Sequence, residues 1–408
     1  MRILAISTWF PFPPDNGSKA RAYNLLSRLG ENHILDLIAL SQSDRDADYL
    51  GKVRGFCRRV EVFPEPRFHP EDMRSWPGFF SPVPRYFLEH HCPEMEALSM
   101  RWAREESYDV ALAVTLGAAP YAAGLDVPFK VLDQHNVESW VIKRRWRNER
   151  SFLRRLRYAP TWMKAERFER AIARKFNAIT VVSKPELCLM EYVLGNNHGE
   201  RIHVIPNGVD SSFLEYPAPA KEHGVLVFTG ALAYQPNYDA AVRLCREVLP
   251  AVRARFPQAR VRITGSLDGA DTTGLRAVAG VELTGYVKDI RPIAASASAL
   301  VVPLRYGGGT RLKILEAMAL GTPVVSTPIG AEGLEVQHEA HILIGETETE
   351  LAEQVSRVLA DHRLAARIAR SARKLVRERY QWDAIAAEFE RVLAKCEEGN
   401  SGICTGEK

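Results

Sequence analysis

Short runs of Val, Ile, Leu and Ala alternate with longer amphipathic stretches along the first half of the chain. Uninterrupted apolar runs of this length are typical of strands buried on both faces, as in parallel sheets. They predict strands at residues 2–8, 34–40, 60–63, 110–114, 130–133 and 178–182. The first helix is expected at about 20–30, ending at Gly30. The alternation predicts an α/β fold with helices on both faces of a parallel sheet.

The same pattern restarts after an interruption at HVIPNGVD, residues 203–210, which is followed by two more prolines. Strands are predicted at 225–228, 261–264, 281–283, 299–303, 324–326 and 342–344. Seven prolines among residues 64–95 predict an irregular excursion from the first sheet. The predicted domains are 1–205 and 221–380, joined by a linker at 206–220, with a last helix at 381–396 and a flexible tail at 397–408.

Composition places the chain among globular proteins. The 408 residues are 46% hydrophobic and 25% charged. No apolar run reaches the roughly 18 residues that a membrane helix needs, and the apolar start is too short for a signal peptide, so it predicts a strand. Six cysteines form no CxxC pair or metal-like cluster. A reducing, cytoplasmic location with free thiols is the simplest interpretation.

Charge is distributed unevenly along the chain. Residues 141–175 hold thirteen Lys or Arg and three Glu, whereas the whole chain has a net charge of only +4. Trp, Phe, Leu and Met are interleaved with these cations. A solvated pair of helices and a surface that docks on anionic lipid headgroups both fit the pattern. Nucleic acid would also suit the charge, but no recognised binding motif is present.

The glycine-rich segment RYGGGTRLKILEAMALGTPVVS, residues 305–326, is the most informative motif. Three glycines join a buried strand to a helix whose first turn is expected to carry Arg311 and Lys313, with Glu316 one turn later. Loop amides, a positive helix end and two cations suit phosphate. The alternative is a tight turn with a Lys313–Glu316 ion pair, but one glycine would suffice for a turn.

Other candidate sites also follow predicted strands. DQHNVES places His135 at a carboxyl strand end, and DNGSK places Gly17 there, with Lys19 and Arg21 as weaker candidates. A loop-capping histidine and a surface Asn-Gly turn are the alternatives. Turns at Gly230, Gly265 and Gly285 follow second-domain strands and could be simple turns or one wall of a nucleotide site, with Val287 meeting the base.

Three further features favour structural roles. SKPE, residues 183–186, predicts a capping box at a helix start, and Asn207 with Gly208 predicts a hinge. Asp44, Asp46 and Asp48 lack the glycine and glutamate of a calcium loop. They are expected to cap a helix, and no metal site is predicted.

Several of these motifs together resemble one family. GGGTRLKILEAMALGTPVVS, VIPNGVD, VVSKPE and FTGALAYQPNYDAA are similar to the retaining GT-B glycosyltransferases of family 4 (group 1), over nearly the whole chain. The resemblance implies two facing Rossmann-like domains with parallel sheets and a central cleft. It implies that the nucleotide lies mostly on the second domain and that the last helix crosses back to the first.

The resemblance also implies roles for particular residues. Glu316 matches the second of two family glutamates and would hold the ribose. The first glutamate would fall at Gly308, so the amides of Gly308, Gly309 and Thr310 are expected to contact the sugar. FTGALAYQPN lacks the family's Arg and Lys, and Arg311 and Lys313 are the expected replacements at the diphosphate.

The remaining assignments concern the same cleft. His135 is expected to contact the donor sugar in the transition state, with Glu138 orienting it or the acceptor. Gly17 would lie under the phosphates or acceptor, and Gly230 on the donor side. Asn237 matches the family's loop, although it could instead cap the helix from Tyr238 onward.

The resulting functional prediction is a metal-independent, retaining glycosyltransferase without a cofactor. It would move a sugar from a nucleoside-diphosphate sugar to a glycan or lipid-linked acceptor hydroxyl in polysaccharide or glycoconjugate assembly. It is expected in the cytoplasm or at the inner face of the membrane, contacting anionic lipid through residues 141–175. A nucleotide-sugar epimerase or hydrolase and a non-catalytic nucleotide-sugar-binding protein are the alternatives.

Overall fold

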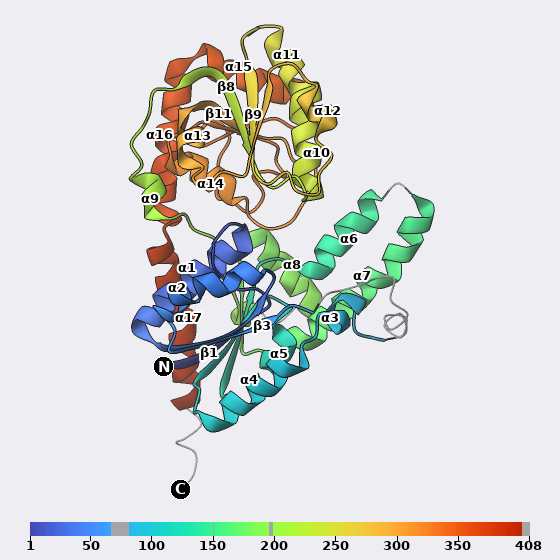
Figure 1. Cartoon of the computed structure of the whole chain (residues 1–408), viewed down its shortest axis with the longest axis vertical. Coiled ribbons are helices and arrows are strands. Elements are labelled where there is room, and N and C mark those ends of the chain that lie inside the picture. Colours follow the sequence, from blue (N-terminus) through green and yellow to red (C-terminus); the bar gives the residue numbers. More distant parts are fainter. Residues whose placement is uncertain (67–80, 150, 196–198, 402–408) are drawn as a thin grey trace. The chain divides into compact units, whose positions relative to one another are not determined.

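The chain divides into two compact units. The computed structural model describes residues 1–66, 81–149, 151–195 and 199–401 (Figure 1). The first unit comprises Met1–Pro206 with Ile385–Lys408, and the second comprises Asn207–Ala384. The division lies beside the start of the linker expected at 206–220. Each unit has its own sheet and its own hydrophobic core.

The first unit is built on a seven-stranded parallel sheet. Its strands are β1 Arg2–Ser7, β2 Ile34–Ser41, β3 Arg59–Pro64, β4 Val110–Val114, β5 Phe129–Gln134, β6 Ala178–Val181 and β7 Ile202–Val204. The order is β3-β2-β1-β4-β5-β6-β7. Side chains on both faces are buried, which explains the uninterrupted apolar runs. The order reverses between β1 and β4, and sheets of this kind bind ligands at the carboxyl ends beside that reversal.

Helices join these strands. They are α1 Gly17–Asn32, η1 Asp44–Tyr49, α2 Leu50–Arg54, α3 Arg85–Glu89, α4 Pro93–Glu105, α5 Ala119–Ala123, α6 Glu138–Asn148, α7 Phe152–Ala173, α8 Lys184–Leu194 and η3 Gly199–Arg201. The expected end at Gly30 is wrong, because α1 runs on to Asn32. A Cβ on Gly30 would lie 2.2 Å from the Phe56 carbonyl oxygen, so the glycine permits close packing.

The Pro-rich segment is only partly irregular. The structure forms α3 and the start of α4 inside residues 85–95, where no helix was expected. Pro93 lies at the beginning of α4, where its missing N–H costs nothing. Residues 67–80 of this segment lie outside the described part of the chain.

The second unit contains a six-stranded parallel sheet. Its strands are β8 Glu222–Thr229, β9 Arg260–Thr264, β10 Val281–Gly285, β11 Ala297–Val302, β12 Val324–Ser326 and β13 Leu343–Ile344, in the order β10-β9-β8-β11-β12-β13. Its helices are α9 Ser211–Leu214, α10 Gln235–Arg243, the π-helical η4 Leu244–Val248, α11 Leu249–Arg253, α12 Thr273–Arg276, α13 Arg291–Ser296, α14 Leu312–Ala319, α15 Glu348–Ala360 and α16 His362–Arg379. Both sheets are doubly wound α/β structures of the Rossmann type.

The last helix, α17 Trp382–Ser401, begins in the second unit and belongs to the first from Ile385 onward. There the Asn32 amide donates to Glu390 with a separation of 2.8 Å. The helix extends into the tail that was expected to be flexible, and residues 402–408 of that tail lie outside the described part.

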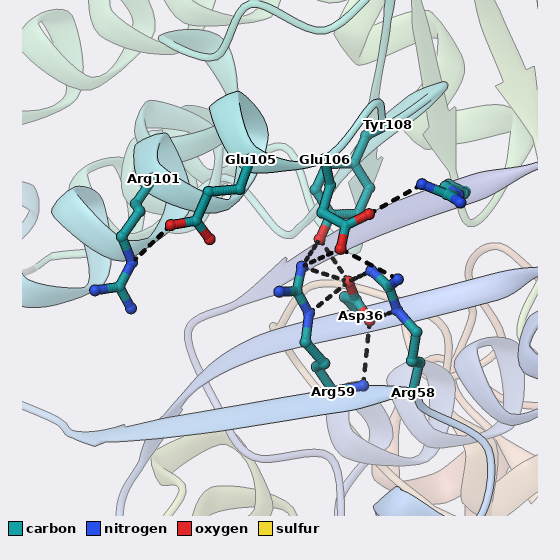
Figure 2. Close-up of polar contacts among 8 residues, drawn as sticks. Asp36, Arg58, Arg59, Arg101, Glu105, Glu106 and Tyr108 are labelled. Atoms are coloured by element: carbon teal, nitrogen blue, oxygen red, sulfur yellow. Dashed lines mark hydrogen bonds and ion pairs between the residues drawn. The ribbon is translucent and has the colours of Figure 1, made fainter.

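A buried carboxylate organises the amino-terminal edge of the first sheet (Figure 2). Asp36, fully buried on β2, accepts hydrogen bonds from Arg58, Arg59 and the Tyr108 hydroxyl. Glu106 pairs with the same two arginines. Burial alone would raise the pKa of Asp36, but Arg58, Tyr108 and Arg59 outweigh it and hold the pKa below its usual range. This edge is opposite the carboxyl ends of the strands, so its network supports the fold.

No helix among the described residues is long and apolar enough to cross a membrane. The described residues also contain no group of three or more His, Cys, Asp or Glu arranged to hold a metal ion. Asp46, which was expected to cap a helix start, lies inside η1 and accepts from the Ser41 hydroxyl and the Gln42 amide, so it ties the preceding turn to this helix and is not its N-cap.

Candidate active site

Three glycine turns lie together at the carboxyl edge of the second sheet. The Gly230 amide donates to the Thr264 carbonyl at 2.8 Å, and the Gly265 amide donates to the Gly285 carbonyl at 3.0 Å. A Cβ on Gly265 would lie 2.3 Å from the Gly230 oxygen, and both residues have a positive φ. The turns after β8 and β9 therefore depend on glycine for close approach, whereas Gly285 at the end of β10 has open space and only its positive φ of +73° favours glycine. Their predicted clustering is confirmed, and their contact with a nucleotide stays a prediction.

The glycine-rich loop connects β11 to α14 and is braced by its own arginine. Gly307 and Gly309 have φ values of +137° and +67°, which glycine adopts without strain. The guanidinium of Arg311 donates to the carbonyls of Gly308 and Gly309. The helix begins at Leu312 with Arg311 as its N-cap, so Arg311 precedes the first turn in which it was expected. The buried side chain of Arg311 therefore shapes the glycine-rich loop. Its expected contact with the diphosphate stays a prediction.

Lys313 reaches from α14 to the loop after β8. Its Nζ lies 3.0 Å from Asn237 Oδ1 and 4.4 Å from the centre of the Phe228 ring. A Cβ on Gly230 would lie 2.8 Å from this ammonium. The loop FTGALAYQPN has no cation of its own, and Lys313 supplies one from elsewhere in the sequence. This position agrees with the replacement role expected of Lys313, which stays a prediction.

Asn237 connects this lysine to the same loop. Its amide nitrogen donates to the Ala231 carbonyl at 3.0 Å, while its oxygen accepts from Lys313. Asn237 lies inside the first turn of α10, whose N-cap is Tyr234. The alternative role as a helix cap is therefore wrong. Pro236 starts the helix earlier than expected because proline suits the first turn.

Lys313 and Glu316 titrate near neutrality. Burial lowers the pKa of Lys313 to about 7, Arg311 lowers it further, and Glu316 opposes the shift. Burial raises the pKa of Glu316 to about 7, with Lys313 opposing it. Both side chains are half-buried. An anionic ligand beside Lys313 would favour its charged form, since an opposite charge stabilises an ammonium.

Two further residues that the sequence singled out, Asn207 and Val287, also belong to the second unit. Asn207, expected to shape the hinge, donates from its amide to the Thr310 hydroxyl at 2.6 Å, so it also anchors the glycine-rich loop. Val287 is half-buried and lies two residues after Gly285, the last residue of β10. Its contact with a base stays a prediction.

At the carboxyl edge of the first sheet, His135 belongs to a buried charge network. Its Nε2 lies 3.1 Å from Asp133 Oδ2. Arg21 forms a two-nitrogen contact with the Asp133 carboxylate, at 2.9 Å from Nε to Oδ2 and 2.7 Å from Nη2 to Oδ1. The Thr180 hydroxyl donates to Asp133 Oδ1 at 2.6 Å. The structure therefore groups α1, β5 and β6 around one carboxylate.

The pKa values of two members of this network are shifted from their usual range. Burial would raise the pKa of Asp133, but Arg21 and His135 outweigh it and keep the pKa far below its usual range. Burial lowers the pKa of His135 although Asp133 opposes that shift. The Arg21 side chain is completely buried and also donates to the Ile205 carbonyl at 2.9 Å. The weaker assignment of Arg21 to a ligand is therefore wrong.

Two buried glutamates from other helices accept hydrogen bonds from the backbone amides at the start of α6, the helix that follows His135. Glu169 accepts from the backbone amides of Glu138 and Ser139 at 2.9 and 3.0 Å, and Glu186 accepts from the Val137 amide at 2.8 Å. Burial raises the pKa of Glu138 to about 7, with Glu169 and Glu186 adding to the shift. Glu138 thus starts α6, and its orienting role stays a prediction.

The capping box at residues 183–186 forms only in part. The Ser183 hydroxyl accepts from the Glu186 amide, as expected of an N-cap. The Glu186 carboxylate instead accepts from Val137, so it links α8 to the loop before α6. The spacing identified the cap correctly but not the partner of its glutamate.

Gly17 is the first residue of α1. Asn16 caps this helix by accepting from the Lys19 amide at 3.0 Å. DNGSK is therefore the start of α1 and is not the surface turn that the sequence offered as the alternative. Contact of Gly17 with phosphates or acceptor stays a prediction.

Comparison with known proteins assigns the family. Residues 223–361 match the model for glycosyl transferases group 1, and residues 15–213 match the model for glycosyltransferase family 4. The chain belongs to the group 1, family 4-like glycosyltransferases. The glycosyltransferase therefore carries family signatures in both units.

Curated relatives agree with this assignment. An uncharacterised glycosyltransferase of Methanocaldococcus jannaschii is 28% identical over 229 residues, which cover 50% of this chain and 56% of the relative. An α-maltose-1-phosphate synthase of Mycobacterium tuberculosis is 29% identical over 309 residues, covering 68% of this chain and 74% of the relative. The matched region thus spans little more than half the length of the archaeal relative.

Solved structures share the fold over nearly the whole glycosyltransferase. Sucrose-phosphate synthase of Thermosynechococcus elongatus has a TM-score of 0.71 at 16% identity, covering 98% of this chain and all of that one. The Anabaena protein HepE, in complex with UDP and glucose, has a TM-score of 0.69 at 17% identity, covering 97% and 100%. The predicted GT-B class with two Rossmann-like, parallel-sheet domains is confirmed.

Proposed function

We propose that this glycosyltransferase moves a sugar from a nucleoside-diphosphate sugar to an acceptor hydroxyl with retention of anomeric configuration. The observation that carries the proposal is the position of the Lys313 ammonium, which lies at the loop after β8 beside Gly230 and Asn237. A cation held at a glycine turn suits the diphosphate of a donor.

Leaving-group stabilisation is the main chemical task in this proposal. Cleavage of the bond to the sugar leaves charge on the nucleoside diphosphate, and preorganised cations and amides stabilise that charge. We assign this task to Lys313 and to the amides of the loop that Arg311 braces. Glu316 would hold the ribose. The proposal expects no metal requirement, so transfer should continue in the presence of a chelator.

Retention and the proton path follow from family resemblance. The acceptor oxygen would attack from the side that the leaving phosphate vacates, and that phosphate would take the acceptor's proton. His135, near the carboxyl end of β5, would contact a substrate hydroxyl. Holding the acceptor oxygen close to the anomeric carbon would contribute much of the rate.

Names of related proteins guide the choice of substrates. HepE structures hold UDP, glucose or UDP-glucose, so UDP-glucose is the first donor to test. One structural neighbour is a glycosyltransferase involved in lipopolysaccharide biosynthesis, and one relative is a phosphatidyl-myo-inositol mannosyltransferase of Mycobacterium leprae. They support polysaccharide or glycoconjugate assembly, with a glycan or lipid-linked acceptor.

The hairpin of α6 and α7 supports a second part of the proposal, contact with an anionic membrane in the cytoplasm. Its aromatic side chains stack with cations: Lys143 Nζ lies 4.8 Å from the Trp140 ring and 4.7 Å from the Trp162 ring. Phe152 and Leu156, one turn apart on α7, are 77% and 63% exposed. Apolar side chains beside many cations are typical of surfaces that bind anionic lipid.

The test is an assay with a panel of nucleotide sugars, with and without glycan and lipid-linked acceptors. The proposal expects acceptor-dependent release of nucleotide, and NMR of the product should give the donor's own anomeric configuration. An epimerase or hydrolase would turn over without acceptor, whereas a binding protein would bind a donor and never turn over. A product of inverted anomeric configuration would contradict retention but would leave the proposed sugar transfer standing.

A further inference from the structure

A hydrogen bond connects the start of the second unit to the glycine-rich loop. The side-chain amide of Asn207 donates to the Thr310 hydroxyl oxygen at 2.6 Å, although the two residues are 103 positions apart. Asn207 is the first residue of the second unit and is only 7% exposed. Thr310 directly follows the three glycines, residues 307–309. The loop is therefore held through Thr310 by a segment that is distant in the sequence.

The glycines of this loop cannot be held in place by side-chain packing. They have no side chains, and glycine loses more conformational freedom on ordering than any other residue. Hydrogen bonds must therefore set the shape of the loop. Arg311 donates to the carbonyls of Gly308 and Gly309, and Asn207 adds a hydrogen bond from outside the loop and its helix. Together these contacts engage successive residues of the loop, from 308 to 310.

The backbone amides of the same residues remain available to a ligand. No described residue accepts a hydrogen bond from the amide of Gly308, Gly309 or Thr310. These residues are half-buried, and a row of successive amides without internal acceptors suits the oxygen atoms of a ligand. Such donors assist binding and reaction only if they are fixed before the ligand arrives. The contacts made by Arg311 and Asn207 provide that fixation.

The segment that carries Asn207 is itself anchored. The Val209 amide donates to the Tyr380 carbonyl at 2.7 Å, and the Val209 side chain is buried. Asp210 accepts from the Ser212 amide at 2.9 Å and caps α9. These contacts fix the backbone that follows Asn207 independently of the glycine-rich loop. Asn207 therefore offers the loop a preformed support.

We propose that Asn207 is a positioning residue of the donor site, which holds Thr310 and thereby sets the loop amides against the sugar of the nucleotide-sugar donor. The proposal rests on the proposed function, since it concerns the donor of the same reaction. It extends that function by giving the first residue of the second unit a role in sugar recognition. Lys313 reaches the loop after β8 through Asn237 and not through this contact. Loss of the contact should therefore weaken a nucleotide sugar more than the nucleotide alone.

Nitrogen NMR of the glycine-labelled full chain tests the support without any ligand. The Gly308 resonance is assigned by its loss in Gly308→Ala, which the backbone tolerates because the φ of Gly308 is not in the left-handed region. Thr310→Val keeps the shape of the side chain but removes its hydroxyl. This variant and Asn207→Ala should both shift or broaden the Gly308 resonance, whereas Thr310→Ser should leave it near its native position. A Gly308 resonance that is unchanged in Asn207→Ala or in Thr310→Val would overturn the proposal.

Calorimetric titration tests the role at the sugar. UDP-glucose is the first probe, and the best-binding member of the nucleotide-sugar panel replaces it if UDP-glucose does not bind. Asn207→Ala and Thr310→Val should each bind the nucleotide sugar roughly tenfold more weakly and its parent nucleotide with near-native affinity. The double variant should be no weaker than either single variant, because both remove the same hydrogen bond. Additive losses, or equal losses for nucleotide and nucleotide sugar, would overturn the proposal.

Matched variants separate positioning from general damage to the fold. Thr310→Ser keeps the accepting oxygen and should bind the nucleotide sugar like the native protein, so a loss as large as that of Thr310→Val would contradict the proposal. Asn32→Ala is the control for loss of an asparagine hydrogen bond, because the Asn32 amide donates to Glu390 in the first unit at 2.8 Å. It should leave both affinities unchanged. If Asn207→Ala does not fold, the comparison of Thr310→Val with Thr310→Ser decides the question alone.

The same titrations distinguish failure of this role from failure of the proposed function. If Asn207→Ala and Thr310→Val bind nucleotide sugars with native affinity, the positioning role of Asn207 is wrong and the proposed sugar transfer still stands. If no nucleotide sugar binds the native protein, the proposed function is wrong, and the positioning role that rests on it falls as well.

Discussion

The ammonium of Lys313 donates to the side-chain oxygen of Asn237 across 3.0 Å, although the two residues are 76 positions apart. This contact joins the first turn of α14 to the first turn of α10 and brings a cation to the loop after β8. The proposed diphosphate site depends on it.

Donor affinity should depend on pH through Lys313. Its pKa is lowered to about 7, so the free protein holds mostly ammonium at pH 6 and mostly amine at pH 8. Binding a diphosphate at pH 8 must therefore take up a proton, and affinity should fall up to about tenfold per pH unit above 7. Calorimetric titration with UDP in buffers of different ionisation enthalpy measures both effects. Lys313→Arg, which stays charged, should lose this alkaline decline; a persistent decline would exclude Lys313 as its source.

Glu316→Gln should stabilise the fold while weakening donor binding. Burial raises the pKa of Glu316 to about 7, so the folded state favours the neutral acid relative to the unfolded chain. The neutral carboxyl group of Glu316 therefore stabilises the fold at pH values below the pKa that this group has in the unfolded chain, and the stabilisation is lost as pH rises through 7. Thermal unfolding should therefore show that Glu316→Gln raises Tm at pH 8 and changes it little at pH 5. An equal shift at both pH values would show that the effect is not electrostatic.

Asp36→Asn should destabilise the protein without affecting the site. The change breaks the buried network with Arg58 and Arg59, which costs about 3 kcal/mol. Chemical denaturation should show the loss, while UDP affinity at a temperature well below Tm stays unchanged. Glu105→Gln is the control, because its pair with Arg101 is exposed and contributes little. An altered UDP affinity would contradict the purely structural role of this edge.

Binding to anionic vesicles should depend on the α6–α7 hairpin. Phe152→Ser/Leu156→Ser removes two exposed apolar side chains, so the fraction bound to phosphatidylglycerol vesicles in a flotation assay should fall several-fold. Ile329→Ser, at an exposed apolar residue of the other unit, should leave the fraction unchanged. Equal binding of both variants would exclude the hairpin as the contact.

Local motifs predicted most of the fold. The apolar runs located the strands because both faces of each sheet are buried, and the glycines after β8, β9 and β10 could be placed at one edge because parallel strands share a direction. Capping residues such as Ser183 were also visible, since a cap acts within four residues.

Contacts between distant segments were not visible in the sequence. Arg21 and Asp133 are 112 positions apart, and nothing local to Arg21 showed that it would be fully buried as a charge partner. Asp133, near the end of a predicted strand and two residues before His135, was the available signal. The contact of Asn237 with Lys313 was not visible for the same reason, because Lys313 comes from another helix. Tertiary packing, which no short pattern encodes, determined these roles.

Titration of UDP into Lys313→Met tests the central claim most directly, because that claim places the donor diphosphate at this ammonium. At pH 6.5 the variant should bind UDP roughly 10- to 100-fold more weakly than the native protein, as expected for loss of a charge-assisted hydrogen bond. Lys374→Met, at an exposed lysine of the same unit, should bind UDP like the native protein. Equal UDP affinity in Lys313→Met and the native protein would contradict the account.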